Sequence, residues 1–289
     1  MAEHFPHLLE VLPERADVTK ETLELLWRAA PEQVRELDQL FAAGAQARLV
    51  QYQSAQLGAV YGAVQIPEKS LRQIWLLAHA AWQELLDFEK LKNGEPIGER
   101  VLIESAVKAA VSLGIDDNLA WPKEIPSFLD HKSGTYAKAI RELFAMAAAW
   151  AIFHEMRHAK FDGEEGRPQE LIAEEIVCDE YALRCLFSDI DKYSKLTGES
   201  EEKVRAKRAM GAMVGLYLIA KLSNKNSGTH PPVQSRMKAL FDAIGDDPAA
   251  NFWGFAIALL VGLNPQLASM RVPPDASLRE GAYLALKNS

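Results

Sequence analysis

The sequence His154-Glu155-Met156-Arg157-His158, set in a strongly apolar segment, constrains this chain more than any other feature. Histidines at positions i and i+4 lie one above the other on a helix, so two imidazole nitrogens can reach one metal ion while Glu155 points toward the same pocket. In a chain of 289 residues with 7 histidines, this spacing arises by accident in roughly one or two cases per hundred. The alternative is a pair of ordinary helix histidines. Whether the motif forms a metal site therefore depends on whether a third ligand follows it in the sequence.

Two helices are predicted around this motif. The first begins near residues 133–135, where Ser and Thr suit an N-cap, and ends at Gly163, because glycine can adopt the left-handed C-cap conformation. Pro168, which is favoured in the first turn of a helix, then precedes a second helical segment over residues 169–182.

A third metal ligand is expected on the second helix. Catalytic zinc takes three protein ligands and keeps one position for water. Glu175 is 17 residues after His158, far enough for an antiparallel helix to bring its carboxylate back to the histidines. Asp179, one turn later, can accept a hydrogen bond from the ligand-histidine nitrogen that does not face the metal. The alternative for these carboxylates is a solvated acidic helix face.

Glu174 and Glu175 differ by about 100° around the helix, so only one of them is expected to face the metal. We favour Glu175 because it has an acid at i+4, whereas Glu174 is followed there by Cys178, whose thiolate is a rival zinc ligand. This choice predicts that Glu175→Ala loses the metal and that Glu174→Ala and Cys178→Ala retain it.

These residues resemble the gluzincin branch of zinc metallopeptidases, whose pattern is HExxH followed on a second helix by ExxxD. The metzincin pattern HExxHxxGxxH is not matched, because Phe161 and Glu164 stand where Gly and His are required. Residues 228–237 are similar to the HP element of HtpX-type and CAAX-processing gluzincins, in which a His and an Arg face the substrate carbonyl. By that resemblance, His230 and Arg236 would stabilise the oxyanion; a helix start without a catalytic role is the alternative.

The phrase FHEMRH, the EExxxDxxA helix and the overall length resemble the family of the phage-exclusion peptidase Lit. The neighbouring ImmA type of phage-regulatory peptidase stays open, because Arg157 and Lys160 depart from the extended zincin signature. The motifs that carry the resemblance cover about residues 134–240, and residues 1–130 match only loosely. It implies a zinc-dependent endopeptidase acting on a protein or peptide substrate, with a host protein cleaved during phage infection as one candidate.

The resemblance also implies a role for each residue. His154, His158 and Glu175 would hold Zn²⁺, and Asp179 would orient a histidine. Glu155 would take a proton from the attacking water and pass it to the leaving amine. Two other functions stay open: a zincin-fold sensor or regulator without proteolysis, and a helical interaction protein with incidental histidines.

Composition favours a cytoplasmic enzyme. A hydrophobic fraction of 48% can build a sizeable core, and a net charge of -8 without a basic block argues against nucleic acid as a partner. Residues 209–222 and 252–263 are apolar but too short to span a membrane, and residues 1–20 lack the features of a secretion signal. Cys178 and Cys185 are too far apart on one helix for a disulfide, so thiols are expected. No motif specifies an oligomeric state.

The remaining periodicity predicts a mainly α protein with a zincin-like helical metallopeptidase fold. The further predicted helices cover residues 18–30, 32–42, 71–91, 101–113, 203–222, 232–244 and 252–263. Residues 48–53 and 59–66 are the strand candidates of a small β element near residues 48–66, and zincins usually carry an edge strand that aligns an extended substrate. Breaks near residues 92–98 and 116–134 divide the chain into a mainly helical subdomain over residues 1–95 and a catalytic region over residues 96–289, or leave one continuous domain.

Overall fold

The protein is mainly helical with one small sheet, as the sequence predicts. The computed structural model describes residues 49–50, 57–60, 63–113, 120–127, 134–161, 165–222, 230–245, 250–263, 267 and 277–288. The helices predicted over residues 18–30 and 32–42 therefore lie outside the described residues. Among the residues that are described, none of the helices has the length and apolar character that crossing a membrane requires.

The observed helices follow the predicted order along the chain. They are α3 (Glu68–Lys92), α4 (Val101–Leu113), α5 (Thr135–Phe161), α6 (Leu171–Phe187), α7 (Ile190–Thr197), α8 (Glu201–Leu222), α9 (Val233–Ile244), α10 (Ala250–Leu263) and α11 (Leu278–Asn288). α7 and α11 have no counterpart in the sequence prediction. α7 buries only Ile190, and α11 buries mainly small residues, so neither has a strong apolar stripe.

The β element is a three-stranded sheet in the order β1-β3-β2. β1 (Leu49–Val50) pairs parallel with β3 (Ala63–Gln65), and β2 (Gly58–Val60) pairs antiparallel with it. The single strand predicted over residues 59–66 is therefore wrong in detail, because its two halves pair with each other. Ala59 and Leu49 both pair with Val64, whose side chain is fully buried.

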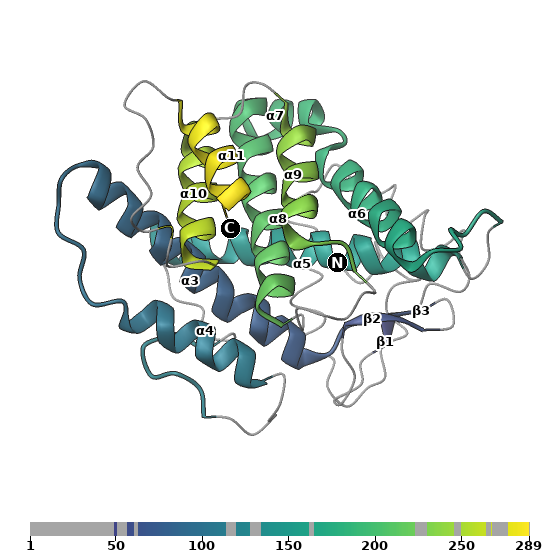
Figure 1. Cartoon of the computed structure of the whole chain (residues 1–289), viewed down its shortest axis with the longest axis horizontal. Helices are drawn as coiled ribbons and strands as arrows, with labels where there is room; N and C mark the ends of the chain where they lie inside the picture. The colour runs from purple at the N-terminus through teal and green to yellow at the C-terminus, as the bar shows by residue number, and fades with distance from the viewer. Residues whose placement is uncertain are drawn as a thin grey trace.

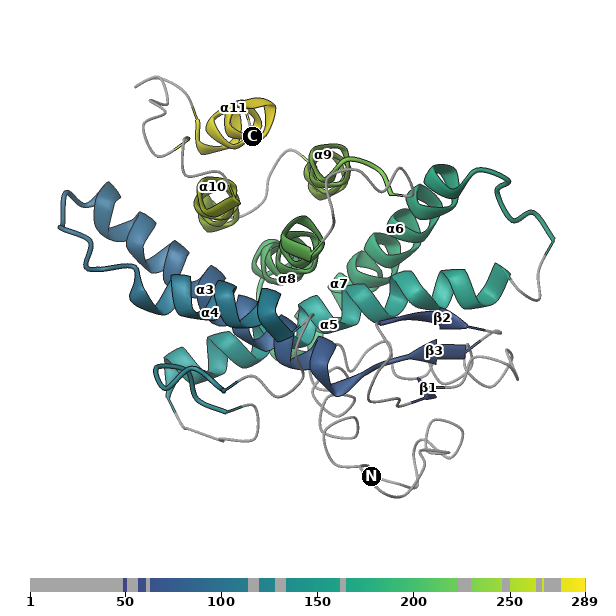
Figure 2. The same cartoon turned by 60° about the horizontal axis from the view of Figure 1, so that its bottom comes forward.

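α5 lies at the centre of the fold. Figure 1 shows α3 and α4 at one end of the molecule, α6 and the sheet at the other, and α8, α9, α10 and α11 between them. α5 crosses this arrangement with the sheet on one side and α8 on the other, and contacts α3, α6, α8, β2 and β3 (Figure 2). Residues 143–154 of α5 are all buried, as expected for a helix that is apolar on every face.

Two glycines allow α8 to approach α5 closely. A Cβ atom on Gly211 would lie 2.1 Å from Cβ of Met146, and one on Gly215 would lie 2.4 Å from the Trp150 ring. The two glycines are one turn apart and face the same neighbour. Because no larger residue fits there, this contact fixes the part of α5 that leads directly into His154.

The chain reverses direction after α5, so that α6 returns along the carboxyl-terminal half of α5 (Figure 2). α9 packs against α6 and α8 and begins beside the same region. The end of α5, the first turns of α6 and the start of α9 therefore meet in space, although they are far apart in sequence.

Candidate metal centre

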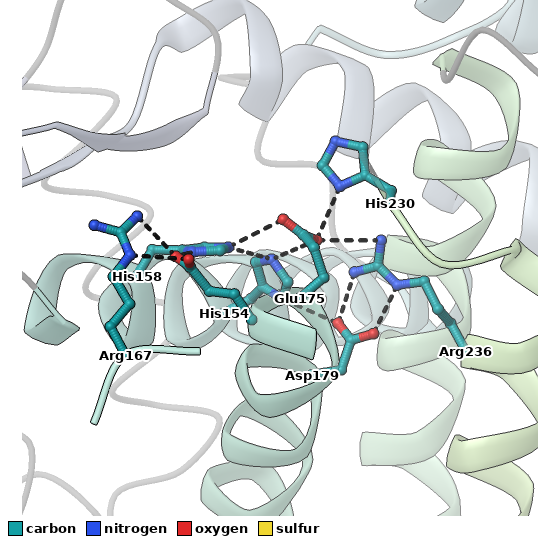
Figure 3. Close-up of polar contacts among 8 residues, drawn as sticks. His154, His158, Arg167, Glu175, Asp179, His230 and Arg236 are labelled. Carbon is teal, nitrogen blue, oxygen red and sulfur yellow. Dashed lines mark hydrogen bonds and ion pairs between the residues drawn. The ribbon is translucent and has the colours of Figure 1, made fainter. Parts of the chain in front are cut away.

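The two motif histidines face Glu175 across the contact between α5 and α6 (Figure 3). Nε2 of His154 and Nε2 of His158 are 3.2 Å apart. The Glu175 carboxylate lies 3.4 Å from Nε2 of His154 and 3.2 Å from Nε2 of His158. The structure thus brings together, largely buried, the three residues that the sequence predicts as metal ligands.

The spacing of these atoms suits a metal ion. A tetrahedral zinc with nitrogen and oxygen ligands at about 2.0–2.2 Å holds neighbouring ligand atoms roughly 3.3 Å apart. Oε2 of Glu175 is buried, and its near neighbours are the positively charged or ionisable groups His154 and His230. A buried carboxylate requires such partners, and a cation at this position would be another. Two imidazoles and a carboxylate are also a donor set found in catalytic zinc sites.

The inner nitrogen of His154 is held by a carboxylate. Its Nδ1 lies 2.9 Å from Oδ1 of Asp179. Arg236 donates two hydrogen bonds to Asp179, at 2.7 Å from Nε and 2.6 Å from Nη2. Burial alone would raise the pKa of Asp179, but His154 and Arg236 hold that pKa below its usual value. The ionised carboxylate can only accept, so Nδ1 of His154 carries a proton and Nε2 is left to face Glu175.

The charges within the centre shift the pKa values of its members. Burial would lower the pKa of His154, but the contacts with Asp179 and Glu175 raise it to about 9. The pKa of His158 is also raised, because contacts with Glu175 and Glu174 outweigh burial. The pKa of Glu175 is lowered despite burial, since both histidines face it. In the metal-free protein the centre therefore favours an added positive charge.

Glu155 lies on α5 between the two histidines and is half-buried. Burial raises the pKa of its carboxyl group, and the charges of His154 and His158 partly offset that rise. A carboxyl group with a raised pKa, held beside both candidate ligands, is suited to accepting a proton from water.

His230 and Arg236 approach the centre from the start of α9, but in different ways (Figure 3). Nδ1 of His230 lies 2.9 Å from Oε2 of Glu175, and its side chain is 47% exposed. Arg236 is 2% exposed and lies 3.8 Å from Glu175, with its guanidinium turned toward Asp179. The resemblance to the HP element predicts that both residues face a substrate carbonyl, but only the His230 side chain is exposed enough to contact a substrate. Arg236 is held inward because a buried guanidinium requires a carboxylate partner.

Glu174 is a member of the centre that sequence reasoning did not assign. Its Oε1 lies 2.7 Å from Nδ1 of His158. Glu175 alone of the two belongs to the group of possible ligands, as predicted, whereas Glu174 approaches the opposite nitrogen of the His158 ring. Cys178 is buried and is not part of the group of possible ligands found among the described residues.

The comparison with known families agrees with this geometry. The sequence model of the peptidase U49 family matches residues 64–256, about two thirds of the chain. The chain belongs to the peptidase U49 family. The U49 match spans the fold from β3 to α10 and contains every residue of the centre, from His154 to Arg236. Membership makes the protein a peptidase, with a protein or peptide as its substrate. No curated protein and no solved structure matches the chain.

Proposed function

We propose that the chain is a zinc-dependent endopeptidase whose metal is held by His154, His158 and Glu175. The observation that carries this proposal is the convergence of three donor atoms, within 4.8 Å of one another, from an HExxH helix and an ExxxD helix. When bound, zinc would lower the pKa of a water molecule and polarise the scissile carbonyl.

The protein's own residues would supply the remaining steps. Glu155 would take a proton from the attacking water and deliver it to the leaving amine. His230, which is half exposed and beside Glu175, would donate a hydrogen bond to the carbonyl oxygen as it gains negative charge. Asp179 would keep the Nδ1 proton on His154, and Arg236 would act through Asp179 and not on the substrate.

Replacement of Glu155 tests this assignment. Glu155→Gln should retain the bound metal while losing activity by about 10² to 10⁴, because it removes a general base and no ligand. Bound zinc would be measured by elemental analysis. Peptide hydrolysis would be measured with a fluorogenic peptide library. The double variant His154→Ala with His158→Ala is the control and should bind no zinc. If Glu155→Gln lost its zinc, the assignment of Glu155 as base would be wrong.

The resemblance to the Lit family supports phage exclusion as the biological setting, with a host protein as the substrate. In extracts of infected cells, the wild-type chain should produce a new protein fragment and Glu155→Gln should not. An effect on infection that was the same for both chains would instead indicate a regulator without proteolysis. Cleavage of a phage or repressor protein in place of a host protein would favour a peptidase of the ImmA type.

A further inference from the structure

His158, like His154, is backed by a carboxylate and a guanidinium. Its Nδ1 lies 2.7 Å from Oε1 of Glu174. Arg167 donates to the same carboxylate, from Nε to Oε2 at 2.9 Å and from Nη2 to Oε1 at 3.0 Å. We call Glu174 with Arg167 the outer pair, and Asp179 with Arg236 the inner pair.

We propose that the outer pair positions His158 as a metal ligand, a role that rests on the proposed zinc site. The guanidinium of Arg167 donates to both oxygens of Glu174, the geometry of an ion pair with an ionised carboxylate. An ionised carboxylate can only accept a hydrogen bond, so it holds the proton of His158 on Nδ1. Nε2 is then directed at His154 and Glu175. A charged acceptor also makes that nitrogen a stronger ligand.

Arg167 gives the outer pair its stability. The Glu174 side chain is 4% exposed, and a carboxylate buried to that degree is costly unless it is paired. Arg167 reaches it with two parallel hydrogen bonds, which fix the orientation of the carboxylate as well as its charge. Arg167 lies in the connection between α5 and α6, so this connection contributes to the centre.

The two pairs differ in their access to solvent. The Arg236 side chain is 2% exposed and that of Arg167 is 49% exposed. Salt screens an exposed charge far more than a buried one. The outer pair should therefore be the part of the centre through which ionic strength weakens metal binding, whereas the inner pair should be insensitive to salt.

Zinc affinity, measured by competition with a chelator, tests the proposal without relying on activity. Glu174→Gln should lower the affinity by about 10 to 100-fold, as is usual when the partner of a ligand histidine is lost. Arg167→Gln should also lower the zinc affinity. The difference in zinc affinity between Arg167→Gln and wild type should become smaller at high salt. Glu170→Gln, an exposed carboxylate one turn before Glu174, is the matched control and should bind zinc as wild type does.

A second readout reports on the histidine itself. With histidine labelled at nitrogen, the Nδ1 proton of His158 should give a protected NMR signal in wild type, with or without zinc. The signal should shift or vanish in Glu174→Gln and Arg167→Gln and persist in Glu170→Gln. Arg167→Lys should restore part of the zinc affinity lost in Arg167→Gln, because it returns the charge without the paired hydrogen bonds.

These measurements distinguish failure of the outer pair's positioning role from failure of the proposed zinc site. If wild type binds zinc and Glu174→Gln binds it equally well with an unchanged Nδ1 signal, the outer pair has no positioning role. If wild type binds no zinc, the proposed function fails, and the Nδ1 signal alone then decides whether Glu174 holds His158. If circular dichroism shows that Glu174→Gln does not fold, the same measurements on Arg167→Gln test the proposal. The Arg167 side chain is half exposed, so its replacement should not prevent folding.

Discussion

Among the residues of the centre, burial decides what each charged side chain can do. Arg236 uses Nε and Nη2 on Asp179 within the core, so its charge stabilises a neighbour and is not free to meet a substrate. His230 comes from the same segment but is exposed, and it is the one that an incoming peptide can contact. Sequence spacing cannot distinguish these two cases, because a His-Pro turn followed by an arginine looks the same whichever way the guanidinium points.

A different buried histidine should make the fold sensitive to acid. His79, on α3, is 3% exposed and packs against the rings of Trp75 and Tyr136. Neither of its nitrogens has a hydrogen-bond partner in the described part of the chain, and burial lowers its pKa to about 4. The unfolded chain, with a histidine pKa near 6.5, therefore binds a proton before the folded one does.

Acid should therefore destabilise the folded protein through His79. The contribution of neutral His79 is fully present above about pH 6.5 and is lost as the pH falls toward 4, by about 3 kcal/mol in all. Urea unfolding at several pH values in this range would measure it. His79→Phe keeps an aromatic ring and cannot be protonated, so its free energy of unfolding should decline less than that of wild type. Parallel declines in the two proteins would exclude His79 as the source.

Among the elements, long segments rich in apolar residues were predictable and short segments were not. α4, α8, α9 and α10 begin and end within about two residues of their predicted bounds, because each contains apolar residues over three or more helical turns. α7 is short and mostly exposed, and the two halves of residues 59–66 are too short to show where one strand ends. The spacing of Glu175 and Asp179 pointed to one face of α6, but it could not show that Glu174 reaches His158 from the side.

The contact between α5 and α8 should be intolerant of a single added methyl group. Replacing glycine by alanine within a helix normally stabilises it by roughly 0.5–1 kcal/mol. Gly211→Ala should do the opposite, because the new Cβ would lie 2.1 Å from Cβ of Met146 and the two helices would have to separate. We expect a loss of about 1–3 kcal/mol in the free energy of unfolding, measured in urea.

Gly98→Ala serves as the control for this experiment. Gly98 has an ordinary φ, and a Cβ atom added there would meet no other atom within 4 Å, so alanine should be tolerated. If Gly211→Ala were as stable as Gly98→Ala, α8 would not be held as closely to α5 as the structure indicates.

At the scale of the whole molecule, the centre depends on how three segments meet. The candidate ligand group was predictable because HExxH and ExxxD each place their residues on one helix face. The packing of α9 against α6 and α8 depends on tertiary contacts that no local spacing records. The guanidinium of Arg236 therefore could be assigned to Asp179 only from the structure.

Removal of the metal should destabilise the whole fold. An ion that binds only the folded chain adds about 3 kcal/mol to the free energy of unfolding at a concentration a hundredfold above its Kd. For a protein of this size, that corresponds to a rise in Tm on the order of 5 °C. Calorimetry with zinc and with a chelator would measure the difference. The double variant His154→Ala with His158→Ala should show none, and an equal rise there would mean that zinc binds elsewhere.

His158 and Glu175 are 17 residues apart in the chain, yet Nε2 and the carboxylate face each other at 3.2 Å. An ion held by both would close a ring in the polypeptide, as a disulfide does. A ring of about 15 residues restricts an unfolded chain by about 3 kcal/mol when the link is permanent. A metal link differs because a chelator or acid, and not a reductant, would open it. It would also leave Cys178 and Cys185 as thiols outside any disulfide.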